Sequence, residues 1–227
     1  MPSCLTGKTS KPVKKRANKP SAMPTPEIAT HAIALGHEPR GENYIAYRLL
    51  SLERGTVIGL VRRSKKPNSQ SNIDLFDEGE FRIELKPGSF SGFIKDAQVE
   101  RKRTLLARNY ESFKAASRLA NIIVANPAHD ENLVGIFDLL SKGLDAWESE
   151  SNPHATYLKC LYLYCRHEGY PVKEEWAQQL PAGEKTFISQ VLNLPLSELN
   201  EEKEALKQAI DSLELYIRHH THIRLGF

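Results

Sequence analysis

The spacing of hydrophobic residues changes once along this chain, near residue 104. Before that point, five short runs of aliphatic, β-branched and aromatic residues are separated by residues typical of turns. In one run, Ile33 and Leu35 alternate with Ala32 and Ala34, which is the period of a β-strand. The pattern predicts strands over residues 28–36, 44–52, 56–63, 80–86 and 93–101.

We expect these strands to form a small closed barrel. Five short strands within about 75 residues suit this architecture, because closure removes the exposed edges of a sheet. An SH3-like barrel would produce much the same pattern.

Beyond residue 104 the hydrophobic residues follow the period of α-helices. The third predicted helix is apolar on several sides, as Tyr157, Leu158 and Cys165 illustrate, and we expect it at the centre of a helical bundle. The predicted helices run from about residue 106 to Asn126-Pro127, from a cap at Asp130, from Asn152-Pro153 to Gly169, and over about 197–219. The fold class is therefore α+β, with a barrel over residues 28–104 and a helical domain over 105–227.

Composition excludes several classes of protein. Charged residues make up 26% and hydrophobic residues 40% of the chain, as in ordinary globular proteins. No apolar run approaches the roughly 18 residues needed to span a bilayer, and the basic N-terminus lacks the apolar segment of a secretory signal. Cys4, Cys160 and Cys165 are too few for a disulfide scaffold. We expect a cytoplasmic protein that does not bind membranes.

Charge is distributed unevenly. Residues 1–27 carry a formal charge of +5, residues 28–105 carry +3 and residues 106–227 carry −5. The first segment has almost nothing to bury, so we expect a disordered basic tail. It is either an arm that contacts nucleic acid or, because Met23 offers a second start, an artefact of the gene model. The basic first half suggests a polyanion as its partner, and the acidic second half suggests that it binds a different partner.

The most informative cluster is the basic run at the end of the third predicted strand. Cations at a strand end on a small barrel resemble the groove with which single-strand-binding folds follow a nucleic-acid backbone. The candidate DNA-binding residues are Arg62, Arg63, Lys65 and Lys66, extended by Lys95, Arg101, Lys102 and Arg103. The aromatic residues available for stacking on bases are Tyr44, Tyr47, Phe90 and Phe93.

No catalytic motif is present. The sequence contains no Gly-rich phosphate loop, no G-x-S-x-G, no H-E-x-x-H and no paired-carboxylate motif. Cys160 and His167 share a helix face and could join the histidines near the C-terminus, His219, His220 and His222, in a zinc site. There is no C-x-x-C pair, however, and single buried cysteines are more often core residues. We expect no enzyme activity, no cofactor and no metal.

Taken in order, these elements resemble the RecO family of bacterial recombination mediators. The family pattern aligns with residues 32–67 without a gap, and the later elements follow in the same order. The resemblance covers about residues 28–220. The segments that carry the resemblance are Ala32-Ile33-Ala34-Leu35, Gly41-Glu42, residues 49–55, the basic run 61–67 and Glu168-Gly169-Tyr170-Pro171.

The resemblance implies an N-terminal OB-fold, a helical domain and binding to single- and double-stranded DNA. It also implies annealing of strands coated by single-strand-binding protein, and cooperation with RecR to load recombinase during DNA repair and homologous recombination in the cytoplasm, at the nucleoid. Arg62, Arg63, Lys65 and Lys66 match the family's basic run.

The chain departs from the family in two respects. Gly36, His37 and Ile45 stand at positions that are often basic in the family, and residues 173–192 replace its four-cysteine zinc module. A second hypothesis therefore stays open: a protein-interaction adaptor whose barrel has lost strong nucleic-acid binding.

Overall fold

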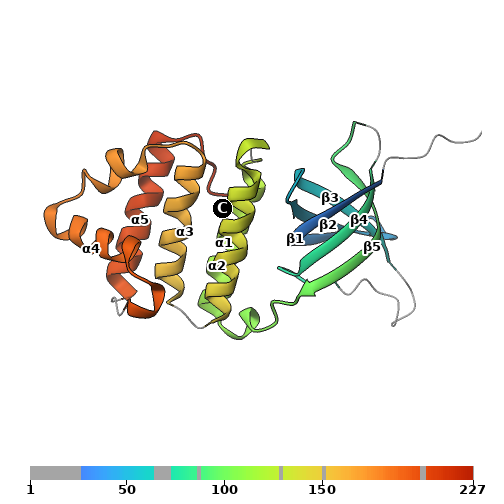
Figure 1. The fold of residues 1–227 in the computed structure, drawn as a ribbon, viewed down its shortest axis with the longest axis horizontal. Coiled ribbons are helices and arrows are strands. Elements are labelled where there is room, and N and C mark those ends of the chain that lie inside the picture. Colours follow the sequence, from blue (N-terminus) through green and yellow to red (C-terminus); the bar gives the residue numbers. More distant parts are fainter. Residues whose placement is uncertain are drawn as a thin grey trace, which may run out of the picture.

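The computed structural model describes residues 27–63, 73–85, 88–127, 130–149, 152–199 and 203–226. It is a mixed α+β fold, in which a five-stranded sheet is followed by helices (Figure 1). Helices α1 and α2 face the strands, and α4 and α5 lie on the far side of the bundle. Within the described residues no helix is long and apolar enough to cross a membrane.

The five strands lie close to their predicted ranges. Closure is produced by β1, which pairs antiparallel with both β2 and β4, so that the strand order around the sheet is β1-β2-β3-β5-β4. The pairing of β3 with β5 is parallel, and the other pairings are antiparallel. The strands are β1 (Glu27–Arg40), β2 (Tyr44–Ser51), β3 (Gly55–Arg62), β4 (Glu78–Leu85) and β5 (Ser91–Arg101).

The middle of strand β1, residues 32–35, is buried on both faces. Ala32 and Ala34 point into the barrel, where they pack with Phe81 and other apolar residues. Ile33 and Leu35 point the other way and belong to the core of the helical domain. Alternating residues of a strand lie on opposite faces, so the small alanines fill the narrow barrel while the larger residues hold the helices against it.

The helical domain is arranged around α3, which packs against α1, α2 and α5. The predicted central position of this helix is confirmed. The Asn152 side chain accepts hydrogen bonds from the backbone N–H groups of His154 and Ala155, at 3.1 and 3.2 Å, and so caps its first turn. The main helices are α1 (Tyr110–Ala125), α2 (Leu133–Glu148), α3 (Pro153–His167), α4 (Ala182–Asn193) and α5 (Lys203–His220).

Three features of this domain differ from the sequence prediction. The last helix, α5, begins at Lys203 rather than near residue 197, because residues 196–198 form a separate 3₁₀ turn that ends in an extended residue. Asp130 begins a 3₁₀ turn, and the N-cap of α2 is Asn132, so the predicted cap at Asp130 is wrong. The short π-helix Lys173–Ala177 and helix α4 were not predicted. Helix α4 buries only Ile188 and Val191, and so few buried positions do not produce a clear helical period.

A buried ion-pair network joins the barrel to α2. The Arg103 side chain is 2% exposed, and its Nη2 donates to Glu78 Oε2 of β4 at 2.9 Å. Its Nη1 pairs with Asp145 of α2 and lies 3.6 Å from Glu148 Oε2. Ser141 of α2 donates to the same Glu78 oxygen at 2.9 Å. One guanidinium therefore neutralises carboxylates from both halves of the molecule.

Glu78 stays ionised in this network. Burial alone would raise the pKa of its carboxyl group, but hydrogen bonds from Ser141, His31 and Arg103 outweigh that effect and lower the pKa. Removal of the arginine would leave a buried carboxylate with too little positive charge around it, which is far more costly than the loss of a surface pair.

We expect Arg103→Met to lower the free energy of unfolding by about 3–5 kcal/mol, because it leaves the buried Glu78 carboxylate without its arginine partner. Arg101→Met is the matched control: Arg101 also pairs with Asp145, at 3.4 Å, but its side chain is 54% exposed. Its loss should cost less than about 1 kcal/mol. Urea denaturation followed by circular dichroism measures both, and equal effects would contradict the structural role of Arg103.

Candidate nucleic-acid interface

The outer face of β2 and β3 carries a mixed aromatic, apolar and basic surface. Tyr44 lies opposite Arg62 in the antiparallel register, and Arg48 lies opposite Ile58. The intervening residues Val57, Gly59 and Val61 turn toward the barrel interior, so the alternation of the strand places Ile58, Leu60 and Arg62 outside. The parallel pairing of Leu60 with Phe93 continues this face onto β5.

Aromatic rings are accessible on this face. The ring centroids of Tyr44 and Phe93 are 5.7 Å apart, and both side chains are half-buried. Phe90, in the connection from β4 to β5, is 71% exposed. The carbonyl of Phe90 accepts a 2.8 Å hydrogen bond from the Ile58 N–H, which ties this connection to β3. Exposed rings held by a fixed backbone are suitable platforms for stacking on bases.

The cations of this region that have no acidic partner among the described residues lie at the end of β3. Arg62 and Arg63 are exposed, and in the part of the chain that the structure describes neither forms an ion pair. The Arg63 N–H donates to the Asn43 carbonyl at 2.7 Å, which fixes the strand end against the β1–β2 turn. Arg48 pairs with Glu38 at 2.8 Å on the exposed surface. The predicted DNA-binding residues Lys65 and Lys66 lie outside the described residues.

Lys95 and Lys102 lie near the end of β3 but already have partners. Both line a cavity of about 400 Å³ that also contacts Val61, the residue before Arg62. Lys95 pairs with Glu84, and Lys102 lies 3.3 Å from carboxylate oxygens of both Asp74 and Asp77. A phosphate would have to compete with these carboxylates, so the two lysines are weaker candidates than Arg62 and Arg63.

Other candidate residues have structural roles. Arg103 is buried between carboxylates and cannot reach a phosphate, which removes it from the predicted site. Arg101 points toward α2, with Nη1 3.4 Å from Asp145 Oδ2 and 3.9 Å from Glu78 Oε2. Tyr47 faces the barrel core and is 3% exposed, so it is inaccessible for stacking.

Three residues of this face, Arg48, Ile58 and Leu60, were not predicted from the sequence. The signal that identifies them is the alternation within β2 and β3, which assigns every second residue to the outer surface. Both faces of these strands carry apolar residues, so the sequence alone does not show which alternating set points outward. The pairing register of β2 and β3 shows it.

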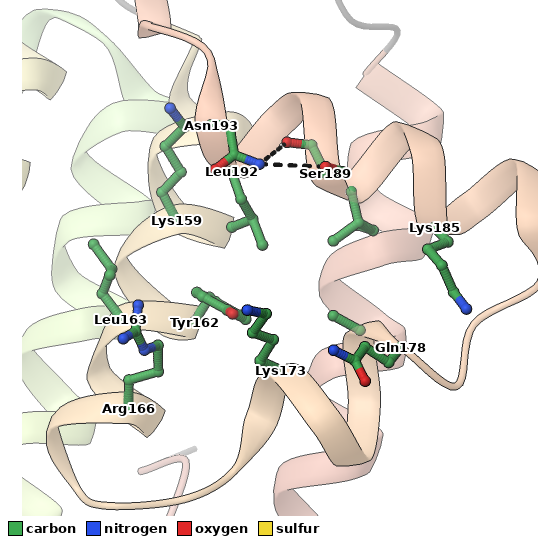
Figure 2. A pocket seen from close by; sticks show the side chains of 12 residues that line it. Lys159, Tyr162, Leu163, Arg166, Lys173, Gln178, Lys185, Ser189, Leu192 and Asn193 are labelled. Carbon is green, nitrogen blue, oxygen red and sulfur yellow. Dashed lines mark hydrogen bonds between the residues drawn. The ribbon is translucent and has the colours of Figure 1, made fainter.

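A second basic site lies in the helical domain. A cavity of about 350 Å³ opens between α3, the π-helix and α4 (Figure 2). Lys173 extends across it toward Tyr162, whereas the end of Lys185 points away. The lining residues include no Asp or Glu; they are Lys159, Tyr162, Leu163, Arg166, Lys173, Ala177, Gln178, Lys185, Ile188, Ser189, Leu192 and Asn193.

The cations around this cavity are largely uncompensated. Among the described residues, no ion pair is formed by Arg166, Lys173 or Lys185. Lys159 Nζ donates to the Leu194 carbonyl, and partial burial lowers the pKa of its ammonium group. With apolar side chains such as Leu163, Ile188 and Leu192 also in the lining, the cavity suits a ligand that is both anionic and apolar.

The structure does not bring the cysteine and histidine candidates together. Cys160 and Cys165 are buried in α3, and His219 and His220 are exposed at the end of α5. His167 packs against Gly135 of α2. Among the described residues, the side chains grouped closely enough to hold a metal ion are those of His31, Glu80 and Glu100, and none of them is a cysteine.

The chain matches no protein-family model, and the search of curated proteins finds no significant match.

We expect Cys160 and Cys165 to resist alkylation in the native protein. Burial raises the pKa of each thiol to about 12, so only about one in ten thousand is a thiolate near pH 8. Iodoacetamide labelling read by peptide mass spectrometry should show both cysteines unmodified without denaturant and modified in urea. Rapid native labelling of either one would mean that α3 is not the closed centre of the bundle.

Proposed function

We propose that this protein binds single-stranded DNA on the outer face of β2, β3 and β5, and acts as a DNA-annealing and recombination mediator of the RecO type. The observation behind the proposal is that the exposed ring of Phe90 and the half-buried ring of Phe93 lie beside β3. At the end of that strand Arg62 and Arg63 are exposed and form no ion pair with a described residue. A cationic surface with stacking platforms binds single strands with little sequence preference.

The arrangement of the strands supports an OB-fold for the barrel. An OB-fold is a five-stranded Greek-key barrel that binds oligonucleotides on the face of its second and third strands and with its first and fourth connections. Here the closed order β1-β2-β3-β5-β4 has five strands, and the candidate face lies on β2 and β3. Phe90 belongs to the fourth connection, between β4 and β5.

The mediator role adds partners to this DNA binding. Following the resemblance, we propose that the protein also binds double-stranded DNA, acts at the cytoplasmic nucleoid with RecR, and works on strands coated by single-strand-binding protein. It performs no catalysis and requires no nucleotide hydrolysis, since binding and alignment of strands are sufficient for annealing.

The basic cavity of the helical domain supports a protein partner. Its cations Arg166, Lys173 and Lys185 surround apolar side chains, so an acidic segment with an apolar residue would meet complementary charge and a place to bury that residue. We propose that single-strand-binding protein docks here through such a segment. The adaptor hypothesis needs only this cavity and not the barrel face, so the two functions can be tested separately.

We expect Arg62→Ala/Arg63→Ala to weaken binding to a labelled oligothymidylate in fluorescence anisotropy. The dependence of log K on log salt should become shallower by about 0.7 for each DNA phosphate that the variant no longer neutralises. Arg82→Ala/Lys142→Ala removes the same charge from exposed positions elsewhere and should change neither quantity. Deletion of residues 1–22 should remove only part of the affinity.

If the tail deletion abolishes binding while Arg62→Ala/Arg63→Ala binds normally, the barrel is not the DNA platform. Failure of the folded wild-type chain to bind at low salt would exclude the mediator role and leave the adaptor.

For the cavity, we expect Arg166→Glu/Lys173→Glu to weaken binding to purified single-strand-binding protein by about tenfold or more, or ~1.4 kcal/mol. Reversed charge repels an acidic segment, while the distant barrel face keeps its DNA affinity. Lys142→Glu/Lys207→Glu, on exposed positions of α2 and α5, is the control for total charge. Surface plasmon resonance measures the interaction, and equal loss in both variants would contradict a specific role for the cavity.

A further inference from the structure

Three side chains converge on the outside of the barrel, away from the face formed by β2 and β3. His31 of β1 lies opposite Glu80 of β4, and Glu80 lies opposite Gln98 of β5, two residues before Glu100. One donor atom from each of His31, Glu80 and Glu100 lies within 4.8 Å of the other two. We propose that these three residues bind a divalent first-row transition-metal ion, for which Zn²⁺ is the appropriate probe.

The separation of the donor atoms fits a common ion. His31 Nδ1 and Glu80 Oε1 are 3.2 Å apart. At metal–ligand bonds of about 2.0–2.2 Å, two ligands of a tetrahedral ion are separated by about 3.3–3.6 Å. The third donor, a carboxylate oxygen of the exposed Glu100, lies within 4.8 Å of the other two.

A buried carboxylate orients the imidazole for this role. His31 Nε2 lies 3.3 Å from Glu78 Oε1, and the other oxygen of Glu78 is held by Arg103 and Ser141, each at 2.9 Å. Glu78 is not one of the three proposed ligands. It positions the ring by accepting a hydrogen bond from Nε2, which places Nδ1 beside Glu80, 3.2 Å from its Oε1. A metal ion bound there would take the place of the Nδ1 proton. Metal-binding histidines usually have such a carboxylate on their second nitrogen.

Packing also restricts the ring. The centroids of the His31 and Phe137 rings are 5.7 Å apart, so α2 limits the rotation of the imidazole. The direction of the donor atom is therefore set by the helical domain as well as by the barrel.

The site has negative charge that protein cations do not balance. In the described part of the chain, neither Glu80 nor Glu100 forms an ion pair with a lysine or arginine, and His31 is the partner of Glu80. The carboxylates of Glu80 and Glu100 therefore have no permanently charged cation beside them, and a divalent ion would supply the positive charge. Imidazole and carboxylate together favour Zn²⁺ or a similar transition metal over Mg²⁺ or Ca²⁺, which prefer oxygen ligands alone.

The test is equilibrium dialysis of the full chain against ZnCl₂, with metal measured by elemental analysis. We expect wild-type protein to bind one Zn²⁺ at this site and Glu100→Gln to bind it at least about tenfold more weakly. Glu100→Gln removes a ligand without touching the buried network. Glu42→Gln, an exposed glutamate in the β1–β2 turn, is the matched control and should retain wild-type affinity.

Because His219 and His220 can also collect zinc, the location of the ion is checked by NMR. We expect Zn²⁺ to shift the ring resonances of His31 in the wild type, and this shift to be lost in Glu80→Gln/Glu100→Gln. The proposal is overturned if no zinc binds at millimolar concentration, or if the variants bind as tightly as the wild type and the His31 resonances do not move.

Discussion

The buried guanidinium of Arg103 is the interaction on which the relation between the two halves of this protein depends. It lies directly after β5 and reaches Glu78 of the barrel and Asp145 of α2. Beside it, apolar residues such as Ile33 and Leu50 extend the helical core onto the outside of the barrel. These residues bury apolar surface between the two halves, while Arg103 joins Glu78 of β4 to Asp145 of α2 through one guanidinium.

This docking determines which barrel surface is left for a ligand. The helices cover the middle of β1 at Ile33 and Leu35, and the outward residues of β3 and β5 lie on another side of the barrel. The division also separates the two proposed binding functions. Nucleic acid would contact the barrel at Arg62 and Phe90, whereas a protein partner would contact α3 and α4 at the cavity that contains Lys173. Both could be occupied at once, as a mediator between coated and bare strands requires.

The sequence predicted the strands well because their alternation and turn residues are local properties. It could not distinguish Arg62 from Arg103, which look alike in a basic region but differ in their neighbours: one is exposed and the other is enclosed by carboxylates from distant parts of the chain. For the same reason the sequence did not predict that His31, Glu80 and Glu100 lie together, since their grouping depends on the register of three strands. Helix α4 was missed because most of its surface is exposed and its apolar period is weak.

The most direct test of the nucleic-acid interface is ultraviolet cross-linking of the full chain to single-stranded DNA, with the attached residues identified by mass spectrometry. Aromatic side chains stacked on bases are well placed to react. If single-stranded DNA stacks on the open face of the barrel, cross-links form at Tyr44, Phe90 and Phe93. Cross-links confined to residues 1–26 or to the helical domain, with none on these rings, would contradict this stacking.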